Sequence, residues 1–236
     1  MDYHIKTENW KYIFNRLSKR QDIRTGNESK LRIFIEAVWF ISRSGCQWRL
    51  LPEKYGSWRA VHRRFKRWSD RGIWSDLLRD STEGADMEYI MVDSTIVRSH
   101  ACSAGYRKNS QDQECLGRSK GGFSTKIHAI VDGLGNPLKF ILTPGQRNDI
   151  TQAEFLIKDF KNTAVIAENQ SEAVIPPRKN RKMQREYDVH VYKERHLIEC
   201  FFGKIKHFRR VFSRFDKTSG VFIGFLNFVA TLIWLR

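Results

Sequence analysis

FSTKIHAIVDGLGNPLKFIL, residues 123–142, predicts a β-hairpin. Two apolar runs, Phe123–Val131 and Leu138–Leu142, are joined by Asp132-Gly133-Leu134-Gly135-Asn136, and turn-forming residues between strand-like runs are a hairpin signal. A further strand is expected before the hairpin, over Tyr89–Thr95. These three strands are the start of a predicted sheet.

Helices and short strands are expected after this hairpin. The helices are predicted over Asp149–Phe160, about 189–212 and 219–235, and the strands over Ala164–Ala167 and Ala173–Ile175. This mixed order of elements indicates an α/β domain. Because the polar stretch Ser81–Glu88 looks like a linker, two domains are expected: a helical DNA-binding leader over residues 1–85 and a catalytic domain over residues 86–236.

Two amphipathic helices are expected in the leader. The first spans residues 29–44, with a cap at Ser29 and an end at Gly45, and the second runs from a cap at Ser57 to about Arg71. Two helices with a short join resemble a helix-turn-helix unit.

The second of these helices is cationic along one face. The cations on it are Arg59, Arg63, Arg64, Lys66, Arg67 and Arg71, against the single acid Asp70. A solvated helix face is the alternative, and DNA contact is favoured. The candidate DNA-binding residues here are Arg63, Arg64, Lys66 and Arg67.

The whole chain is strongly basic. Its 42 Lys+Arg and 26 Asp+Glu give a formal net charge of +16, which indicates a polyanionic partner, with nucleic acid as the first candidate. Hydrophobic residues at 41% exclude a disordered chain. A basic surface without a specific partner, or a ribosomal-type binding protein without catalysis, is the alternative.

A cytoplasmic location is expected. Residues 1–20 lack the apolar core of a signal peptide, and Val221–Leu235 is short for a bilayer span, so this stretch predicts a buried helix and no membrane partner. The four cysteines form no C-x-x-C pair, so neither a zinc site nor a redox motif is indicated.

Polar side chains recur at helical spacing between residues 192 and 206. On one helix, Tyr192, Arg195, Glu199 and Lys206 share a stripe about 60° wide. The opposite side carries Leu197, Ile198, Phe201, Phe208 and Phe212. A lone Glu is normally a surface ion-pair partner, but a Glu between two cations fits a metal ligand beside phosphate-binding groups.

Phosphodiester chemistry assisted by metal ions needs several carboxylates that converge on hard cations. Asp93, expected at the end of a strand, is the natural second ligand, because a strand end holds a side chain rigidly.

Several motifs of this chain occur together in one known family. They are Tyr192-x2-Arg195-x3-Glu199-x6-Lys206, Val92-Asp93-Ser94-Thr95, the run Gly117–His128 and the N-terminal run Gly45–Pro52. By these motifs the sequence resembles bacterial insertion-sequence transposases of the DDE type, in the insertion-sequence four/five grouping. The similarity covers nearly the whole chain.

The resemblance implies a ribonuclease-H-like catalytic core, Mg²⁺ as the cofactor with Mn²⁺ as a substitute, and double-stranded DNA as the partner. That DNA would be the terminal inverted repeats of the element and the target DNA. Asp93 and Glu199 would be catalytic metal ligands, and Tyr192, Arg195 and Lys206 would hold DNA phosphates. A nucleoid-associated protein, as a homodimer or in mixed assembly with full-length copies, is expected.

The chain departs from the family at one motif. The second catalytic Asp belongs to an Asp-x-Gly-Tyr motif, which does not occur here. Only Glu168–Ser171 separates the two strands where the motif is expected, and a parallel crossover needs roughly a dozen residues. An internal deletion and a sheet disrupted near residues 164–176 are therefore predicted. Impaired catalysis is expected, with Glu168 or Asp149 as substitutes for the missing Asp.

Two other functions stand beside this one. A non-catalytic DNA end-binding protein or inhibitor derived from a transposase is the alternative that the missing motif favours. A housekeeping ribonuclease-H-like nuclease is disfavoured by the spacing of Tyr192, Arg195, Glu199 and Lys206.

Further cations are expected to contact DNA. Residues 178–217 hold 13 Lys/Arg and 5 Asp/Glu, which predicts a phosphate track around Glu199. The named candidates are Lys120, Arg178, Lys179, Arg181 and Lys182.

Overall fold

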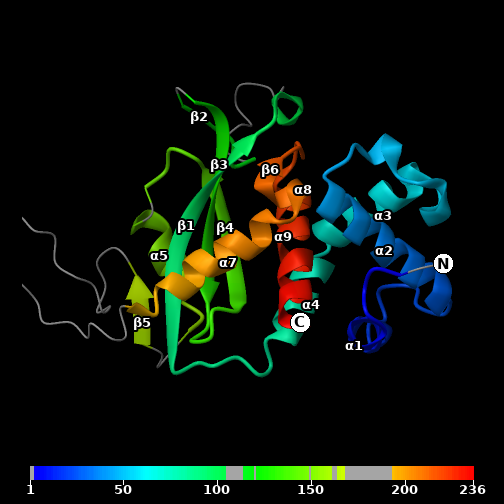
Figure 1. Ribbon diagram of the computed structural model, residues 1–236, viewed down its shortest axis with the longest axis horizontal. Coiled ribbons are helices and arrows are strands. Elements are labelled where there is room, and N and C mark those ends of the chain that lie inside the picture. The colour runs from blue at the N-terminus through cyan, green and yellow to red at the C-terminus, as the bar shows by residue number, and fades with distance from the viewer. Residues whose placement is uncertain (1–2, 105–113, 120, 149, 161–163, 168–192) are drawn as a thin grey trace, which may run out of the picture.

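The computed structural model describes residues 3–104, 114–119, 121–148, 150–160, 164–167 and 193–236 (Figure 1). Its N-terminal part is helical. The helices are α1 (Thr7–Ser18), α2 (Glu28–Ser44), α3 (Trp58–Asp70) and α4 (Ile73–Ser81). The join between α2 and α3 contains two 3-10 turns, Trp48–Leu50 and Glu53–Tyr55.

The ends of α2 follow from the residues that flank it. The side chain of Asn27, not Ser29, caps the helix by accepting a hydrogen bond of 2.9 Å from the backbone nitrogen of Lys30. Gly45 ends it in the left-handed conformation at φ 65°, which glycine adopts without steric cost. The expected helix over residues 29–44 is therefore confirmed to within one residue.

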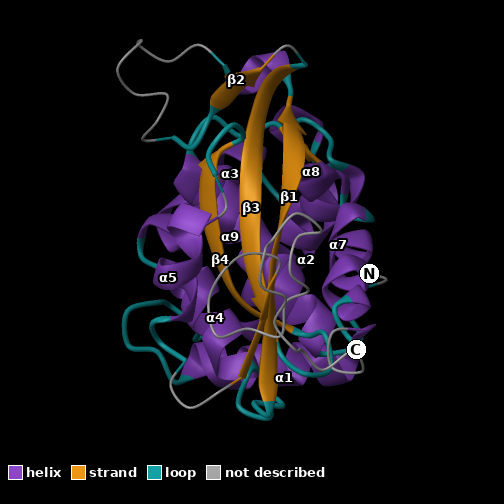
Figure 2. Ribbon diagram, turned by 90° about the vertical axis from the view of Figure 1, so that its left-hand side faces the viewer, coloured by secondary structure: helices purple, strands orange, loops and turns teal. Residues whose placement is uncertain are grey.

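A mixed sheet follows the helices. Its strands are β1 (Tyr89–Ser99), β2 (Gly117–Ser119), β3 (Gly122–Val131), β4 (Pro137–Pro144), β5 (Ala164–Ala167) and β6 (Ser213–Arg214). β1 pairs with β3, and β3 with β4, in antiparallel register, whereas β5 and β6 pair with β1 in parallel register. Figure 2 shows β1, β3 and β4 running side by side. The predicted α/β, ribonuclease-H-like fold is confirmed.

The predicted hairpin is formed by β3 and β4. Asp132 is fully buried in its turn, and one carboxylate oxygen accepts hydrogen bonds from the backbone nitrogens of Leu134 (3.1 Å) and Asn136 (2.7 Å). Gly135 has φ 81°, a conformation that favours glycine. The turn residues therefore fix the register of β3 and β4.

Helices lie on both faces of the sheet. α5 (Ile150–Ile157) covers one face, where Leu156 packs with Ile90, Val92 and Ile130. α7 (His196–Lys206) crosses the other face, in front of the strands in Figure 1. Its side chains Ile198, Phe201, Phe202 and Ile205 are buried.

The C-terminal helix α9 (Ser219–Trp234) lies between the sheet and the N-terminal helices (Figure 1). It packs against α3, α4 and β4. A Cβ on Gly224 of α9 would lie 2.4 Å from the hydroxyl oxygen of Ser69 on α3, so α9 and α3 approach each other closely. The buried helix expected over Val221–Leu235 is confirmed, and no helix in the described part of the chain is long and apolar enough to cross a bilayer. The domain division at residues 85 and 86 stays a prediction.

The helix expected over residues 189–212 is interrupted. α7 ends at Lys206, Phe208 adopts an extended conformation, and a short helix α8 (Arg209–Phe212) follows. The prediction of one continuous helix was wrong. The break at Phe208 turns the later residues away from the side on which continuous helical spacing would place them. Phe212, expected on the apolar side, is accordingly 60% exposed.

The expected sheet lies partly outside the described residues. The strand over Ala164–Ala167 is confirmed as β5. The disruption near residues 164–176 and the strand Ala173–Ile175 fall mainly on residues 168–192, which lie outside the described residues.

We expect His62 to make the stability of the protein depend on pH. Its ring packs edge-on against Trp48, with ring centroids 4.9 Å apart. Burial lowers the pKa of His62 below its ordinary value of 6.5; Asp216 opposes the shift, and Arg210 and Lys66 add to it. The unfolded chain therefore takes up a proton first, so stability is lost as the pH falls from 6.5 towards the lowered pKa.

We expect His62→Gln to reduce this loss. Urea unfolding midpoints of both proteins at pH about 7.5 and about 5.5 measure it, since histidine titrates in that interval. An equal drop in both proteins would contradict the assignment to His62.

Candidate active site

Asp93 lies in the middle of β1, not at its end. β1 continues to Ser99, so the expected strand end at Asp93 was wrong. The described part of β5 ends opposite Val92, one residue before Asp93. Asp93 shares its face of β1 with Met91, which packs in the core on the α7 side. One carboxylate oxygen of Asp93 also accepts a hydrogen bond of 2.7 Å from the backbone nitrogen of Ser94.

Arg195 joins the two candidate carboxylates. One terminal nitrogen of its guanidinium donates to the Oδ2 of Asp93 at 2.9 Å, and the other donates to the Oε1 of Glu199 at 3.1 Å. The Arg195 and Asp93 side chains are 19% and 15% exposed, whereas Glu199 is 60% exposed. The predicted approach of Asp93 to Glu199 therefore occurs through a shared cation, between residues far apart in the sequence.

The start of α7 is positioned by the hairpin turn. A Cβ on Gly135 would lie 3.0 Å from the Cβ of Leu197, so the missing side chain lets the turn approach α7. Arg195 occupies the residue before the helix, and the buried side chains of α7 anchor the segment that follows. Helix and turn together hold Arg195 and Glu199 over β1.

The two carboxylates suit a divalent cation by their chemistry. Both offer hard oxygen donors, and both direct an oxygen at one positive group, which shows that their charges converge. Among the described residues no three His, Cys, Asp or Glu side chains form a group that could hold a metal ion. Glu168 and Asp149, the expected substitutes for a further ligand, lie outside the described residues.

The candidate DNA contacts on α3 differ in their surroundings. Arg63 and Arg67 are exposed, whereas Lys66 is paired with Asp70 at 2.6 Å. Arg64 is partly buried, with its guanidinium 4.4 Å from the ring centroid of Phe34.

On α7, Lys206 is exposed. Tyr192, Lys120, Arg178, Lys179, Arg181 and Lys182 lie outside the described residues.

Two cations of the expected phosphate track have a structural role instead. Arg210 forms a buried ion pair with Asp216, in which each side chain is 5% exposed. Arg214 is fully buried and donates to the backbone oxygens of Glu114 (2.7 Å) and Lys217 (2.8 Å). The charge count over residues 178–217 therefore includes two cations that are not available to a phosphate track, because charge alone does not report burial.

Known families match both parts of the chain. The model of the putative transposases of the IS4/5 family matches residues 5–78, and the model of the transposase DDE domain matches residues 84–172. The putative transposase for insertion sequence element IS6501 of Brucella ovis is 38% identical, over 48% of this chain and 99% of the relative. This chain belongs to the IS4/5-type DDE transposases.

An uncharacterized protein of Sinorhizobium fredii, y4sN, is similar to this transposase as well. It is 36% identical, over 44% of this chain and 83% of the relative. No solved structure matches the chain. DDE transposases generally use divalent metal ions, in agreement with the donor chemistry of Asp93 and Glu199.

Proposed function

We propose that this transposase binds the terminal inverted repeats of its insertion sequence and cleaves DNA phosphodiester bonds, with Asp93 and Glu199 as its catalytic residues. The observation that carries the proposal is the convergence of both carboxylates on the Arg195 guanidinium. Two acids that far apart in sequence, held around one positive charge in a protein of net charge +16, fit an active site for a polyanionic substrate better than a surface ion pair.

Asp93 and Glu199 would hold Mg²⁺, with Mn²⁺ as a substitute. When bound, the metal would supply Lewis-acid stabilisation of the leaving oxygen and activation of the attacking water or 3′-hydroxyl. Asp93 would be the rigid ligand, because it lies on a central strand, and Glu199 would be the more accessible one. Arg195 keeps both carboxylates directed at the same point and carries guanidinium donors of the kind that bind phosphate.

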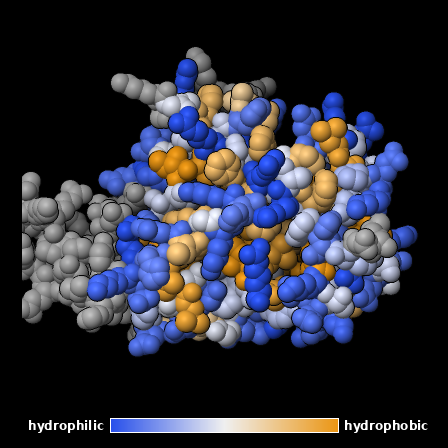
Figure 3. Space-filling model, in the orientation of Figure 1, coloured by the Kyte–Doolittle hydropathy of each residue, from blue (hydrophilic) through white to orange (hydrophobic). Residues whose placement is uncertain are grey.

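The DNA strand would be held by exposed cations of α7 and of α3. Lys206 lies on α7 together with Glu199, and Arg63 and Arg67 are exposed on α3. Figure 3 shows hydrophilic residues over much of this face, with hydrophobic patches between them. From the sequence we add Tyr192, Lys120, Arg178, Lys179, Arg181 and Lys182.

Catalysis by this copy is proposed to be slow. The absence of an Asp-x-Gly-Tyr motif removes the usual third carboxylate, and a misplacement of a catalytic group by ~1 Å can cost about 10²-fold in rate. We propose an internal deletion as the origin, with Glu168 as the substitute ligand. The protein would act in the nucleoid, as a homodimer or in mixed assembly with full-length copies.

A second function is favoured by the same missing motif. A non-catalytic protein that occupies the element ends would need the DNA contacts and no complete metal site. It would lower transposition by full-length copies in a mixed assembly.

A single assay distinguishes the two functions. Purified protein is incubated with labelled end DNA and with scrambled DNA, in Mg²⁺ or Mn²⁺, and both binding and nicking are followed. Preferential binding with slow nicking supports the first function, and preferential binding without nicking supports the second. Equal binding to both DNAs would contradict both.

A further inference from the structure

A cavity of about 790 Å³ lies in the helical part of the chain, away from Asp93 and Glu199. It is open to solvent on one side and is lined by the connection between α1 and α2, by the first turn of α2 and by α3 with the residue that follows it. Its walls include Asp22, Arg24, Lys30, Arg64, Arg67 and Arg71. Five cations therefore face one carboxylate.

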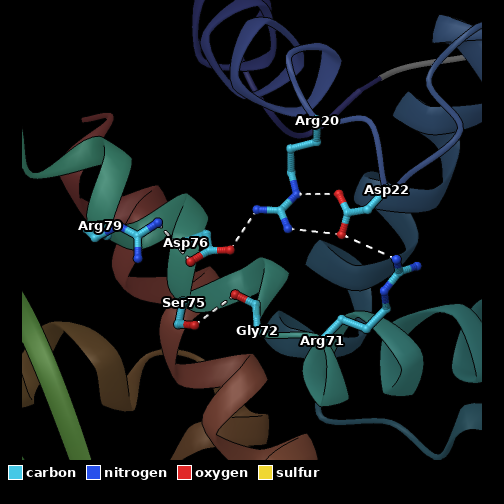
Figure 4. A network of polar contacts seen from close by, with 7 residues as sticks. All are labelled: Arg20, Asp22, Arg71, Gly72, Ser75, Asp76 and Arg79. Atoms are coloured by element: carbon cyan, nitrogen blue, oxygen red, sulfur yellow. Dashed lines mark hydrogen bonds and ion pairs between the residues drawn. The ribbon is translucent and has the colours of Figure 1, made fainter.

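The single acid does not neutralise the cavity. Arg20 donates to both carboxylate oxygens of Asp22, at 2.9 and 3.0 Å, and to Asp76 at 2.6 Å. Figure 4 shows this bridge, with Arg71 approaching Asp22 from the other side at 3.5 Å. Hydrogen bonds from Arg20 lower the pKa of Asp22, so its charge is already matched by a cation that does not line the cavity.

Three of the cavity cations are exposed and have no carboxylate partner among the residues that the structure describes: Arg24, Lys30 and Arg67. Arg64 is held rigidly, with its guanidinium 4.4 Å from the ring centroid of Phe34 and 5.0 Å from that of Trp68. Burial lowers the pKa of Arg64, and nearby Arg67 lowers it further. Like charges are thus held close together, an arrangement that an anion would stabilise.

The cations also continue out of the cavity. Arg63, outside the cavity, and Arg67 lie four residues apart on α3, and Arg71 directly follows the helix; all three are exposed, so they form a row. Four residues of helix rise about 6 Å. A small anion would need only the cavity, whereas a row that starts there fits an extended polyanion.

We propose that this cavity binds a backbone phosphate of DNA, with Lys30 and Arg67 as direct contacts and Arg64 and Arg24 beside them. The proposal rests on the DNA binding proposed above and adds the place where the helical part holds the strand. The ion pairs of Arg20 would act as positioning contacts, because they fix the connection between α1 and α2 against α4.

The test compares Lys30→Ala/Arg67→Ala with Lys11→Ala/Lys54→Ala. Lys11 and Lys54 are also exposed and do not line the cavity, so this control removes the same charge. Affinity for a labelled end duplex is measured at several salt concentrations. We expect about a tenfold or greater loss for the cavity variant and a salt slope shallower by about 2, because each phosphate contact accounts for about one unit.

The outcomes separate this proposal from the proposed function. If the wild-type protein does not bind end DNA, the proposed function fails first. If it binds, and the cavity variant keeps the affinity and salt slope of the control, the cavity proposal alone is overturned. Binding of inorganic phosphate by the wild type and not by the cavity variant, with the same DNA affinity in both proteins, would assign the cavity to a free anion and would also overturn the proposal. Thermal unfolding checks that all variants are folded.

Discussion

Replacing Glu199 with alanine is expected to lower metal-dependent nicking of end DNA roughly 10³-fold, because a metal ion supplies several kcal/mol of transition-state stabilisation that depends on its ligands. Glu199 is 60% exposed and lies at the start of α7, so the change leaves no cavity behind. Nicking rates with Mn²⁺ and affinity for the end duplex are measured on the same preparations, and the affinity is expected to change little.

Glu194→Ala is the matched control. Glu194 lies in the same segment, five residues before Glu199, and takes no part in the ion pairs of Arg195 with Asp93 and Glu199. Its substitution should leave nicking near the wild-type rate. An equal loss of nicking rate in the two variants, or an unchanged rate in Glu199→Ala, would show that Glu199 is not part of the active site.

The second large effect concerns stability. Asp216→Ala is expected to lower the free energy of unfolding by about 3–5 kcal/mol, because it leaves the charge of Arg210 buried without its partner. The pair is joined by hydrogen bonds of 2.5 and 3.0 Å, and Arg210 also donates to the backbone oxygen of Cys46. This contact ties the segment after α7 to the join between α2 and α3.

Urea unfolding measures the effect of Asp216→Ala, with Asp70→Ala as the control. The Lys66–Asp70 pair is about half exposed, so its loss should change stability by no more than roughly 0.5 kcal/mol. A similarly small change for Asp216→Ala would mean that the buried pair does not hold the helical part to the rest of the chain. Replacing both partners by apolar residues, as in Arg210→Met/Asp216→Leu, should restore most of the stability.

The hairpin and the ends of the helices could be predicted because local chemistry determines them. Residues 132–136 contain the Asp, Gly and Asn that the turn uses, and Gly45 ends α2 as expected. The length of β1 could not be predicted in the same way. Ile96, Val97 and Arg98 extend the pairing with β3. Arg98 and Ser99 also pair with β6, a strand more than a hundred residues later, and no local pattern reports such a partner.

The candidate site was predictable only in part. Helical spacing placed Arg195 and Glu199 on one face, and their ion pair agrees with it. Periodicity does not bring Asp93 to α7, because that contact depends on the packing of α7 across the sheet. The burial of Arg210 and Arg214 was missed for a related reason: a buried Arg and a DNA-binding Arg look alike in a sequence.

Direct detection of bound Mn²⁺ tests the central claim, that Asp93 and Glu199 form one metal site. Mn²⁺ is titrated into the protein with a short end duplex, and electron paramagnetic resonance measures the free Mn²⁺. The amount of Mn²⁺ bound by the duplex alone is subtracted. We predict that the wild-type protein binds Mn²⁺ at the site and that Asp93→Asn/Glu199→Gln loses this binding while still binding DNA. Equal Mn²⁺ binding by the two proteins, or none above the duplex alone in the wild type, would contradict the account.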